Sequence, residues 1–359
     1  MVQAIRAALL VTALLLFAGH ARAVPDVGPP TRVHQDGAVL GMTVSCPTWG
    51  WEWGSDAMVD TLHELAGLGV NWVAIHPYAS IRDDGSVQWR EIDPADPPDW
   101  IARPIREAHA LGMKILIKPH IAYWGSGWDW RGAITLPSAA QRTRFFTDYG
   151  RWIEQMAAAS AGADAFAVGT ELDKLVQYEP EWRAVIKAVR GRYAGPLTYA
   201  SNWTDYDKVP FWDALDVIGV QAYFPLMSQV DGVPTDAQLD RGWDPVLAGL
   251  RRESKRVGKP VVFTELGYDR SSRAAVEPWK VEPGGKDAAA IQEACLRSAV
   301  RAIDREPVVV GAFLWKWFPG ARQPSDFAHS TPRMRAVIAE LWGARQAPAG
   351  QAPSGQHAP

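Results

Sequence analysis

Residues 261–267 read Val261-Val262-Phe263-Thr264-Glu265-Leu266-Gly267, a short apolar run that ends in polar residues. Val and Phe are favoured in strands, and a run this short between polar residues is typical of a buried strand in a parallel sheet. A second run of this kind, Ala165-Phe166-Ala167-Val168-Gly169-Thr170-Glu171-Leu172, lies earlier in the chain and also ends in Thr-Glu-Leu. Each stretch therefore predicts a buried strand with a glutamate at its carboxyl end.

Working outward from these two runs, six more short apolar runs alternate with longer segments whose apolar residues recur at helical spacing. Such alternation is expected of βαβ units. The predicted strands cover 41–46, 70–76, 114–119, 165–168, 197–200, 217–222, 261–264 and 308–314. The predicted helices cover 55–68, 100–111, 139–159, 181–192, a short piece near Tyr206, 237–256, 286–304 and 332–341.

Eight strand–helix pairs predict an α/β fold of the (β/α)8 TIM-barrel type, in one domain over 37–343. Its rival, the doubly wound sheet, usually carries a glycine-rich phosphate loop after the first strand. The residues at that place are Ser45-Cys46-Pro47-Thr48-Trp49, which fit neither phosphate motif. The barrel is therefore favoured.

Both ends of the chain lie outside this predicted domain. Arg6, the apolar run 7–18 and Ala21-Arg22-Ala23 are typical of a secretory signal peptide over 1–23, so the mature protein is expected to start at Val24 and to be secreted, extracellular or periplasmic. The alternative is an uncleaved signal anchor. Residues 24–36 are expected to form an extended lead-in and 344–359 a disordered tail, and no later segment is apolar enough to insert in a membrane.

The charge pattern and the cysteine count limit the partners and the stabilising bonds. Formal net charge is -3 without a basic cluster, so we expect a neutral partner and no nucleic acid. Cys46 and Cys295 are the only cysteines. We expect two buried free thiols rather than one disulfide, because the two residues belong to elements that should lie apart.

The strand ends carry the residues that point to chemistry. The long non-helical segments 77–98, 122–137, 224–235 and 267–285 all follow strands, so they should gather at the carboxyl face of the barrel, where active sites lie. Glu171 and Glu265 end strands on this face. A retaining glycosidase needs two carboxyl groups about 5–5.5 Å apart, one as nucleophile and one as acid/base. Tyr223, at the neighbouring strand end, is the expected hydroxyl donor to Glu265.

Further polar residues end the other strands, namely His76, Lys118, His120, Asn202 and Trp203. Histidine and carboxylate are also metal ligands, but no H-x-H or H-E-x-x-H spacing occurs, and Lys118 would bring a positive charge into the site. We therefore expect no metal and no cofactor. Lys118 and the two histidines are expected to hydrogen-bond sugar hydroxyls.

Tryptophan is abundant, with 18 in the chain, and two loops hold three each: Trp49, Trp51 and Trp53, and Trp124, Trp128 and Trp130. Sugar rings present flat C–H faces that stack on aromatic rings, whereas a single tryptophan is more often part of a core. Six in two loops favour sugar binding, with Trp49 as a candidate. Trp315, at the end of the last strand, is the candidate platform beneath the sugar that is cleaved.

Taken together, Lys118-Pro119-His120, Gly169-Thr170-Glu171-Leu172, Asn202-Trp203, Tyr223, Thr264-Glu265-Leu266-Gly267 and Trp315 resemble glycoside hydrolase family 113. The resemblance covers about 41–317 and implies a retaining endo-β-1,4-mannanase, with Glu171 as acid/base and Glu265 as nucleophile. Related barrels carry Asn before the acid/base Glu to bind the sugar 2-hydroxyl, whereas Thr170 stands here. Asn202 and Lys118 are candidates to replace it.

Two alternatives remain open at this point. The protein could hydrolyse or transglycosylate another β-glycan, such as an envelope polysaccharide, because a signal peptide fits nutrition and envelope remodelling equally. It could also be a carbohydrate-binding barrel without catalysis, which the presence of both carboxylates disfavours. In each case the expected partner is a β-linked polysaccharide or oligosaccharide, bound by a monomer.

Overall fold

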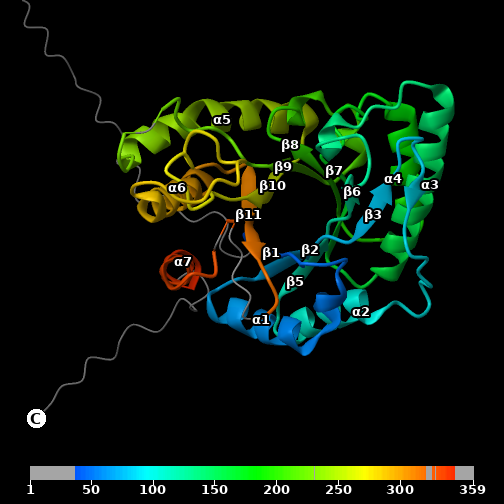
Figure 1. The fold of residues 1–359 in the computed structure, drawn as a ribbon, viewed down its shortest axis with the longest axis horizontal. Helices are drawn as coiled ribbons and strands as arrows, with labels where there is room; N and C mark the ends of the chain where they lie inside the picture. The colour runs from blue at the N-terminus through cyan, green and yellow to red at the C-terminus, as the bar shows by residue number, and fades with distance from the viewer. Residues whose placement is uncertain (1–36, 230, 321–325, 328, 344–359) are drawn as a thin grey trace, which may run out of the picture.

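A computed structural model describes residues 37–229, 231–320, 326–327 and 329–343. Eight parallel strands form the closed barrel that the sequence predicts, in the order β1-β11-β10-β9-β8-β7-β5-β2 (Figure 1). They are β1 (Val39–Val44), β2 (Trp72–Ile75), β5 (Lys114–Ile117), β7 (Ala165–Thr170), β8 (Leu197–Asn202), β9 (Val217–Gln221), β10 (Val261–Leu266) and β11 (Val309–Trp317). The signal peptide, lead-in and tail predicted for 1–36 and 344–359 lie outside the described residues.

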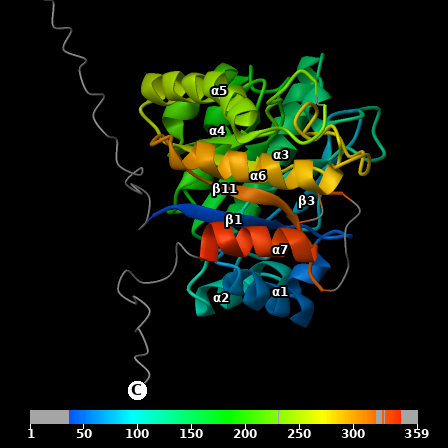
Figure 2. The ribbon, with the colours of Figure 1, turned by 90° about the vertical axis from the view of Figure 1, so that its left-hand side faces the viewer.

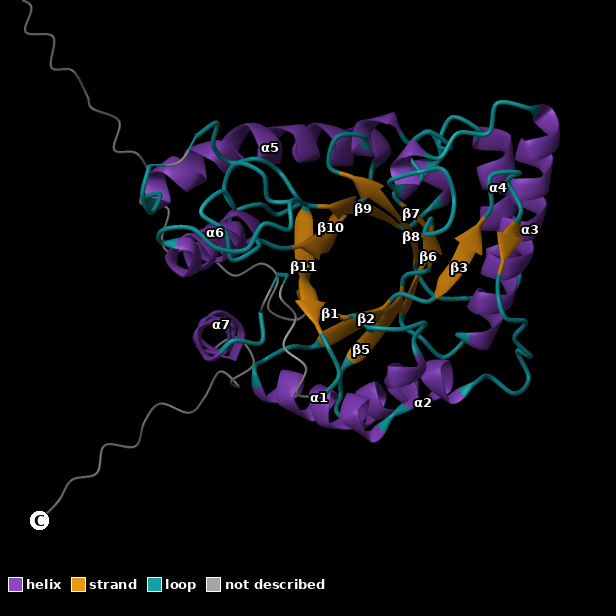
Figure 3. Cartoon of the chain, in the orientation of Figure 1, coloured by secondary structure: helices purple, strands orange, loops and turns teal. Residues whose placement is uncertain are grey.

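Helices cover the outside of the barrel, as Figure 3 shows. They are α1 (Asp56–Gly67), α2 (Asp99–Ala110), α3 (Ala139–Ala159), α4 (Glu179–Arg190), α5 (Asp236–Val257), α6 (Ala288–Asp304) and α7 (Pro332–Ile338). The short piece predicted near Tyr206 is two 3-10 turns, Tyr206–Lys208 and Trp212–Ala214. The two longest helices begin at capping boxes, Ser138 with Gln141 and Thr235 with Gln238, which satisfy backbone N–H groups that the first helical turn leaves free.

Four of the strands that end at the site extend further than the sequence predicted. Strands β7, β8 and β10 each continue two residues past their predicted ends, to Thr170, Asn202 and Leu266, and β11 continues three, to Trp317. Thr170 still pairs with Ala200, and Asn202 with Gln221. The prediction stopped at the first polar residues, whereas parallel pairing continues because it uses the backbone. The site residues are therefore held on or next to the barrel wall.

A small second sheet forms in segments that were predicted as loop. Its strands, in the order β4-β3-β6, are β4 (Val87–Gln88), β3 (Tyr78–Ile81) and β6 (His120–Ala122). Tyr78 pairs in parallel with His120, and Ser80 pairs antiparallel with Gln88. Strands of two to four residues are too short to give a periodic signal. This sheet extends the carboxyl face of the barrel at β2 and β5, which precede β3 and β6 in the chain.

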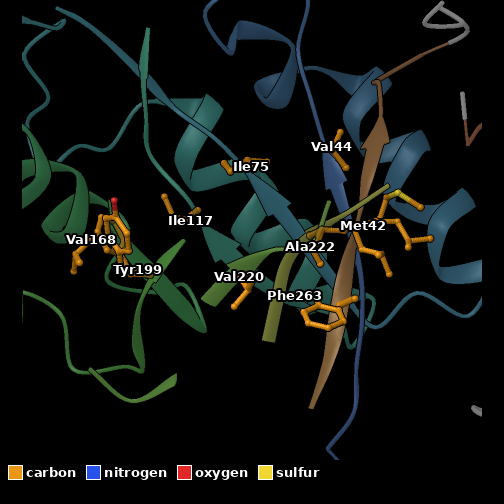
Figure 4. Close-up of a cluster of buried hydrophobic side chains, with 14 of the residues drawn as sticks. Met42, Val44, Ile75, Ile117, Val168, Tyr199, Val220, Ala222 and Phe263 are labelled. Atoms are coloured by element: carbon orange, nitrogen blue, oxygen red, sulfur yellow. The ribbon is translucent and has the colours of Figure 1, made fainter. Parts of the chain in front are cut away.

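The larger hydrophobic core lies between the barrel wall and the helices and includes Met42, Val44, Ile75, Ile117 and Phe263 (Figure 4). The alternate strand positions form a second, smaller cluster that fills the barrel interior, as in other TIM barrels: Val39, Ala74, Leu116, Val262 and Phe313. The first and last strands close the barrel, since β1 pairs in parallel with β11 beside α7 (Figure 2).

Two further expectations concern cysteines and membrane spans. Cys46 and Cys295 are both buried and unpaired, as expected. Within the described ranges, no helix combines the length and apolar character that a membrane crossing requires.

Candidate active site

A cleft of about 680 Å³ opens at the carboxyl ends of the barrel strands. Six of the predicted site residues line it: Glu171, Asn202, Trp203, Tyr223, Glu265 and Trp315. The other lining residues are Tyr78, Tyr123, Trp124, Trp130, Arg131, Thr204, Trp279, Val281, Lys316, Asp326 and Phe327. The fold thus gathers residues from seven separate regions of the chain around the two glutamates.

Glu265, on β10, is held by one cation and one hydroxyl. Its side chain accepts hydrogen bonds from the ammonium group of Lys118 and, at 2.7 Å, from the hydroxyl of Tyr223. Lys118 also donates to the side chain of Gln221 at 3.4 Å and to the carbonyl of Thr264 at 3.3 Å. Burial lowers the pKa of Lys118, while the charge of Glu265 acts in the opposite direction. Glu265 thus accepts one charge-assisted hydrogen bond and one from a neutral hydroxyl.

Glu171 follows the last residue of β7 and stands in a different environment. Its carboxyl oxygen Oε2 accepts a hydrogen bond from Arg131 Nη1 at 3.0 Å. Burial nevertheless raises the pKa of Glu171 and the negative charge of Glu265 adds to this, while Arg131 and Lys118 oppose it. A carboxyl group with a raised pKa keeps its proton closer to neutral pH, which suits a proton donor.

The backbone at Glu171 is fixed in an uncommon conformation. Its φ is 50°, in the left-handed region, and its N–H donates to the carbonyl of Ala200 at 2.8 Å. The next residue, Leu172, donates its N–H to the hydroxyl of buried Tyr199 at 2.8 Å. A Cβ at Gly169 would lie 2.8 Å from Trp182 and 2.9 Å from Tyr199, so only glycine fits there. Neighbouring residues thus fix the direction of the Glu171 side chain.

Three predicted site residues lie buried beneath the cleft instead of lining it, namely His76, Lys118 and His120. The imidazole centroids of His76 and His120 are 4.8 Å apart, and that of His76 is 5.3 Å from the ring of Trp315. Burial lowers the pKa of both histidines well below the usual value, and nearby positive charges add to this, so both are neutral. They support Trp315 from below, and their direct contact with a sugar stays a prediction.

The tryptophans of the two predicted loops have different positions. Trp124 and Trp130 line the cleft, whereas Trp53 is fully buried and donates its indole N–H to the carbonyl of Val44 at 2.9 Å. Trp49 is half-exposed at the edge, with its ring 6.0 Å from that of Trp124. Trp315 lies near the carboxyl end of the last strand, β11, and lines the cleft, and its peptide bond to Lys316 is cis.

Several cleft residues were missed by reasoning from the sequence. Arg131 contacts Glu171, Trp279 stacks on Trp203 at 5.5 Å, and Lys316 pairs with Asp326 at 2.6 Å. Arg131 and Trp279 belong to long loops without periodicity, so their place was not readable from spacing. An arginine next to a tryptophan in a loop after a strand is a weak signal that could have singled out Arg131.

Among the residues that the structure describes, no group of three or more His, Cys, Asp or Glu is placed to hold a metal ion. The side chains in and below the cleft offer carboxyl groups, two lysines, an arginine, tyrosines and other aromatic rings. This set can transfer protons and form a covalent ester with a sugar.

Solved structures with the same fold include three structures of mannanases. A GH113 β-mannanase from Alicyclobacillus acidocaldarius in complex with ManMIm is 26% identical, with a TM-score of 0.73, over 87% of this chain and 99% of that one. Two structures of a GH113 β-1,4-mannanase are 21% and 22% identical, with TM-scores of 0.73 and 0.72, over 86% and 85% of this chain and 99% of each of theirs. A search of curated proteins found no match.

Comparison with family models gives the assignment. The model of Glycoside Hydrolase Family 113 matches residues 42–331, which include all eight barrel strands except the start of the first. The match covers both glutamates and every residue that lines the cleft. The chain belongs to Glycoside Hydrolase Family 113 and is a glycoside hydrolase.

Proposed function

We propose that the protein is a retaining endo-β-1,4-mannanase, in which Glu265 is the nucleophile and Glu171 the acid/base. The observation that carries this assignment is the contrast between the two carboxyl groups in one cleft. Lys118 and Tyr223 both donate hydrogen bonds to Glu265. Burial raises the pKa of Glu171. A proton donor and a nucleophile require two carboxyl groups in different environments.

In the first step the carboxylate of Glu265 attacks the anomeric carbon of the bound sugar. The bond from this carbon to the glycosidic oxygen breaks, and Glu171 donates its proton to that oxygen. The products are a glycosyl ester on Glu265 and a shortened chain that leaves. Because the ester removes the negative charge from Glu265, the pKa of Glu171 no longer carries that contribution, which favours its next role as a base.

In the second step Glu171 takes a proton from a water molecule, and the water oxygen attacks the anomeric carbon. The bond between this carbon and Glu265 breaks, the carboxylate is restored, and the sugar keeps its β configuration. Lys118 and Tyr223 stabilise the carboxylate as it leaves. The stereochemical outcome is therefore a direct prediction of the mechanism.

Mannan is the proposed substrate because the similar structures in this family are described as β-mannanases. In the cleft, Trp315 provides a platform for the reacting sugar, and Asn202 and Trp203 stand at the end of β8 to bind the next unit. Trp49 lies at the edge. Direct hydrogen bonds from Lys118, His76 and His120 to sugar hydroxyls would require the sugar to reach below the present floor of the cleft.

Secretion is part of this proposal, supported by the signal-like sequence of residues 1–23. A polymer of mannose is too large to enter a cell, so an enzyme that cuts it would have to act outside. We further propose that the enzyme acts as a monomer, because the barrel brings both glutamates into one cleft of a single chain.

The test is hydrolysis of mannan, glucomannan, xylan, mixed-linkage glucan and cellulose by the purified chain, with Glu171→Gln and Glu265→Gln as variants. We expect rapid internal cleavage of mannan that either substitution abolishes. With an activated aryl β-mannoside and azide, Glu171→Gln should form the β-glycosyl azide and Glu265→Gln should not. A β-azide from the Glu265 variant alone would reverse the assigned roles. Cleavage of another polymer only would replace mannan as the substrate.

A further inference from the structure

Beside the catalytic cleft lies a second concavity of about 260 Å³, which we call the tryptophan groove. Its lining is Trp49, Trp51, Tyr78, Ser80, Gln88, Trp89, Arg90, Ile92, Trp100, Trp152 and Met156. Tyr78 lines both the groove and the cleft. Across the boundary, the ring of Trp124 in the cleft lies 5.2 Å from that of Tyr78 and 6.0 Å from that of Trp49. The two concavities therefore share one aromatic edge.

The groove presents large apolar rings to solvent. Trp49 and Trp51 are each 49% exposed, although tryptophan is mostly buried in folded proteins. Exposed aromatic residues gathered in one concavity are typical of a binding site. Trp51 is held from two sides, because the ring of Trp100 meets it at 6.4 Å and the guanidinium of Arg90 lies 5.3 Å from its centroid.

The small sheet makes this groove a fixed structure. Strand β3 supplies Tyr78 and Ser80, and β4 supplies Gln88, which pairs with Ser80 across the sheet. Behind them, the indole N–H of Trp89 donates to the side chain of Gln155 on α3 at 2.8 Å. The rings are thus held in place before any ligand arrives, which lowers the entropy lost on binding.

We propose that the tryptophan groove binds sugar units of the same polysaccharide beyond those in the catalytic cleft, so that one neutral chain occupies both. This inference rests on the proposed function. Sugar rings offer flat C–H faces to Trp51 and Trp49, while Gln88, Arg90 and Ser80 offer hydrogen bonds to hydroxyls. Once the cleft holds one part of the chain, the next part is present at high effective concentration beside the groove.

The charge of the groove fits a neutral polymer. Among the described residues that line it, Arg90 is the one with a formal charge, and its guanidinium is engaged over the ring of Trp51. An acidic polysaccharide or an acidic peptide would be expected to meet several cations. A neutral glycan needs aromatic faces and a few polar groups, which is what the groove contains.

The test measures kcat/KM for long and short substrates. The long substrates are mannan and a manno-oligosaccharide such as the hexasaccharide, and the short substrate is the trisaccharide. In Trp51→Ala we expect the ratio of kcat/KM for long over short substrates to fall about tenfold, the size of one lost aromatic contact. Arg90→Gln should lower the same ratio by a smaller factor. Val233→Ala is the matched control, because Val233 is 45% exposed and lines neither concavity. An unchanged ratio in Trp51→Ala overturns the proposal.

A second measurement separates this inference from the proposed function. The inactive variant Glu265→Ala and the double variant Trp51→Ala/Glu265→Ala are run in native gels that contain mannan, where binding to the polymer retards migration. Loss of retardation in the Trp51 variant supports the groove as a glycan site, and equal retardation overturns it. If the wild-type enzyme cleaves no mannan at all, the proposed function fails. The same pair of variants is then run in a gel that contains the polymer which the enzyme does cleave, and this gel tests glycan binding by the groove separately.

Discussion

Arg131 Nη1 lies 3.0 Å from Oε2 of Glu171, so the proposed acid/base forms an ion pair with a cation from the loop before α3. Glu265 has a separate cation, Lys118. Each carboxyl group in the cleft thus has its own positive partner. Burial raises the pKa of Glu171 even though Arg131 opposes this.

Removing the charge of Arg131 should move the pH profile of the enzyme. Arg131 favours the ionised form of Glu171, so Arg131→Gln should raise the pKa of Glu171 further. The proton donor then stays protonated to higher pH. We expect the alkaline limb of kcat/KM against pH to shift upward. Arg106→Gln, an exposed arginine on α2, should leave the limb in place.

The hydroxyl of Tyr223 donates to Glu265 at 2.7 Å, and both groups are buried. Tyr223→Phe keeps the ring and removes this one donor. A hydrogen bond to a charged group contributes about 1.5–3 kcal/mol, so kcat/KM should fall by about 10- to 100-fold. The loss should appear with activated aryl mannosides as well as mannan, because the hydroxyl acts on the nucleophile and not on the leaving group. Wild-type rates in Tyr223→Phe would show that this contact has no catalytic role.

The buried pair of Lys118 and Glu265 should couple in stability as well as in activity. Lys118 is fully buried and Glu265 is 4% exposed, so removing either charge leaves the other without its partner. We expect Lys118→Met to lower the free energy of unfolding by about 3–5 kcal/mol. In the double variant Lys118→Met/Glu265→Gln part of this loss should be recovered, since no uncompensated charge remains. Denaturant titrations of the four proteins measure the coupling; strictly additive losses would mean that the pair is not coupled.

The sequence predicted the barrel and the two glutamates because both depend on local patterns. Strand and helix periodicities are regular over the whole body, and Thr-Glu-Leu stands at the carboxyl end of both β7 and β10. The partner of Glu171 was not predictable, because Arg131 reaches it only through the path of a long loop. Lys118 was expected at the sugar, and it lies buried against Glu265, because a lysine directly after a barrel strand can point inward when a carboxylate faces it.

The positions of the tryptophans were also only partly predictable from the sequence. Their number in two loops correctly indicated aromatic residues at the cleft, such as Trp124. The spacing of the tryptophans did not distinguish Trp53, which is core, from its loop neighbours, and it did not predict that strands of two to four residues fold Tyr78 and Gln88 into a separate groove. Burial and pairing across loops are tertiary properties that spacing along the chain does not carry.

The left-handed backbone at Glu171 leads to a last prediction, about stability. A φ of 50° costs a residue with a Cβ about 1–2 kcal/mol, and glycine adopts it freely but loses more entropy on folding. Glu171→Ala keeps the Cβ in this conformation and Glu171→Gly does not, while both remove the buried carboxyl group. We therefore expect the glycine variant to unfold at a higher denaturant concentration than the alanine variant, by about 1 kcal/mol in free energy. Gly67 is a control with an ordinary helical setting on α1, where Gly67→Ala should stabilise the protein. If Glu171→Ala proves as stable as Glu171→Gly, the backbone there is not strained, and the direction of the acid/base side chain must be set by the contacts of Arg131 and Leu172 alone.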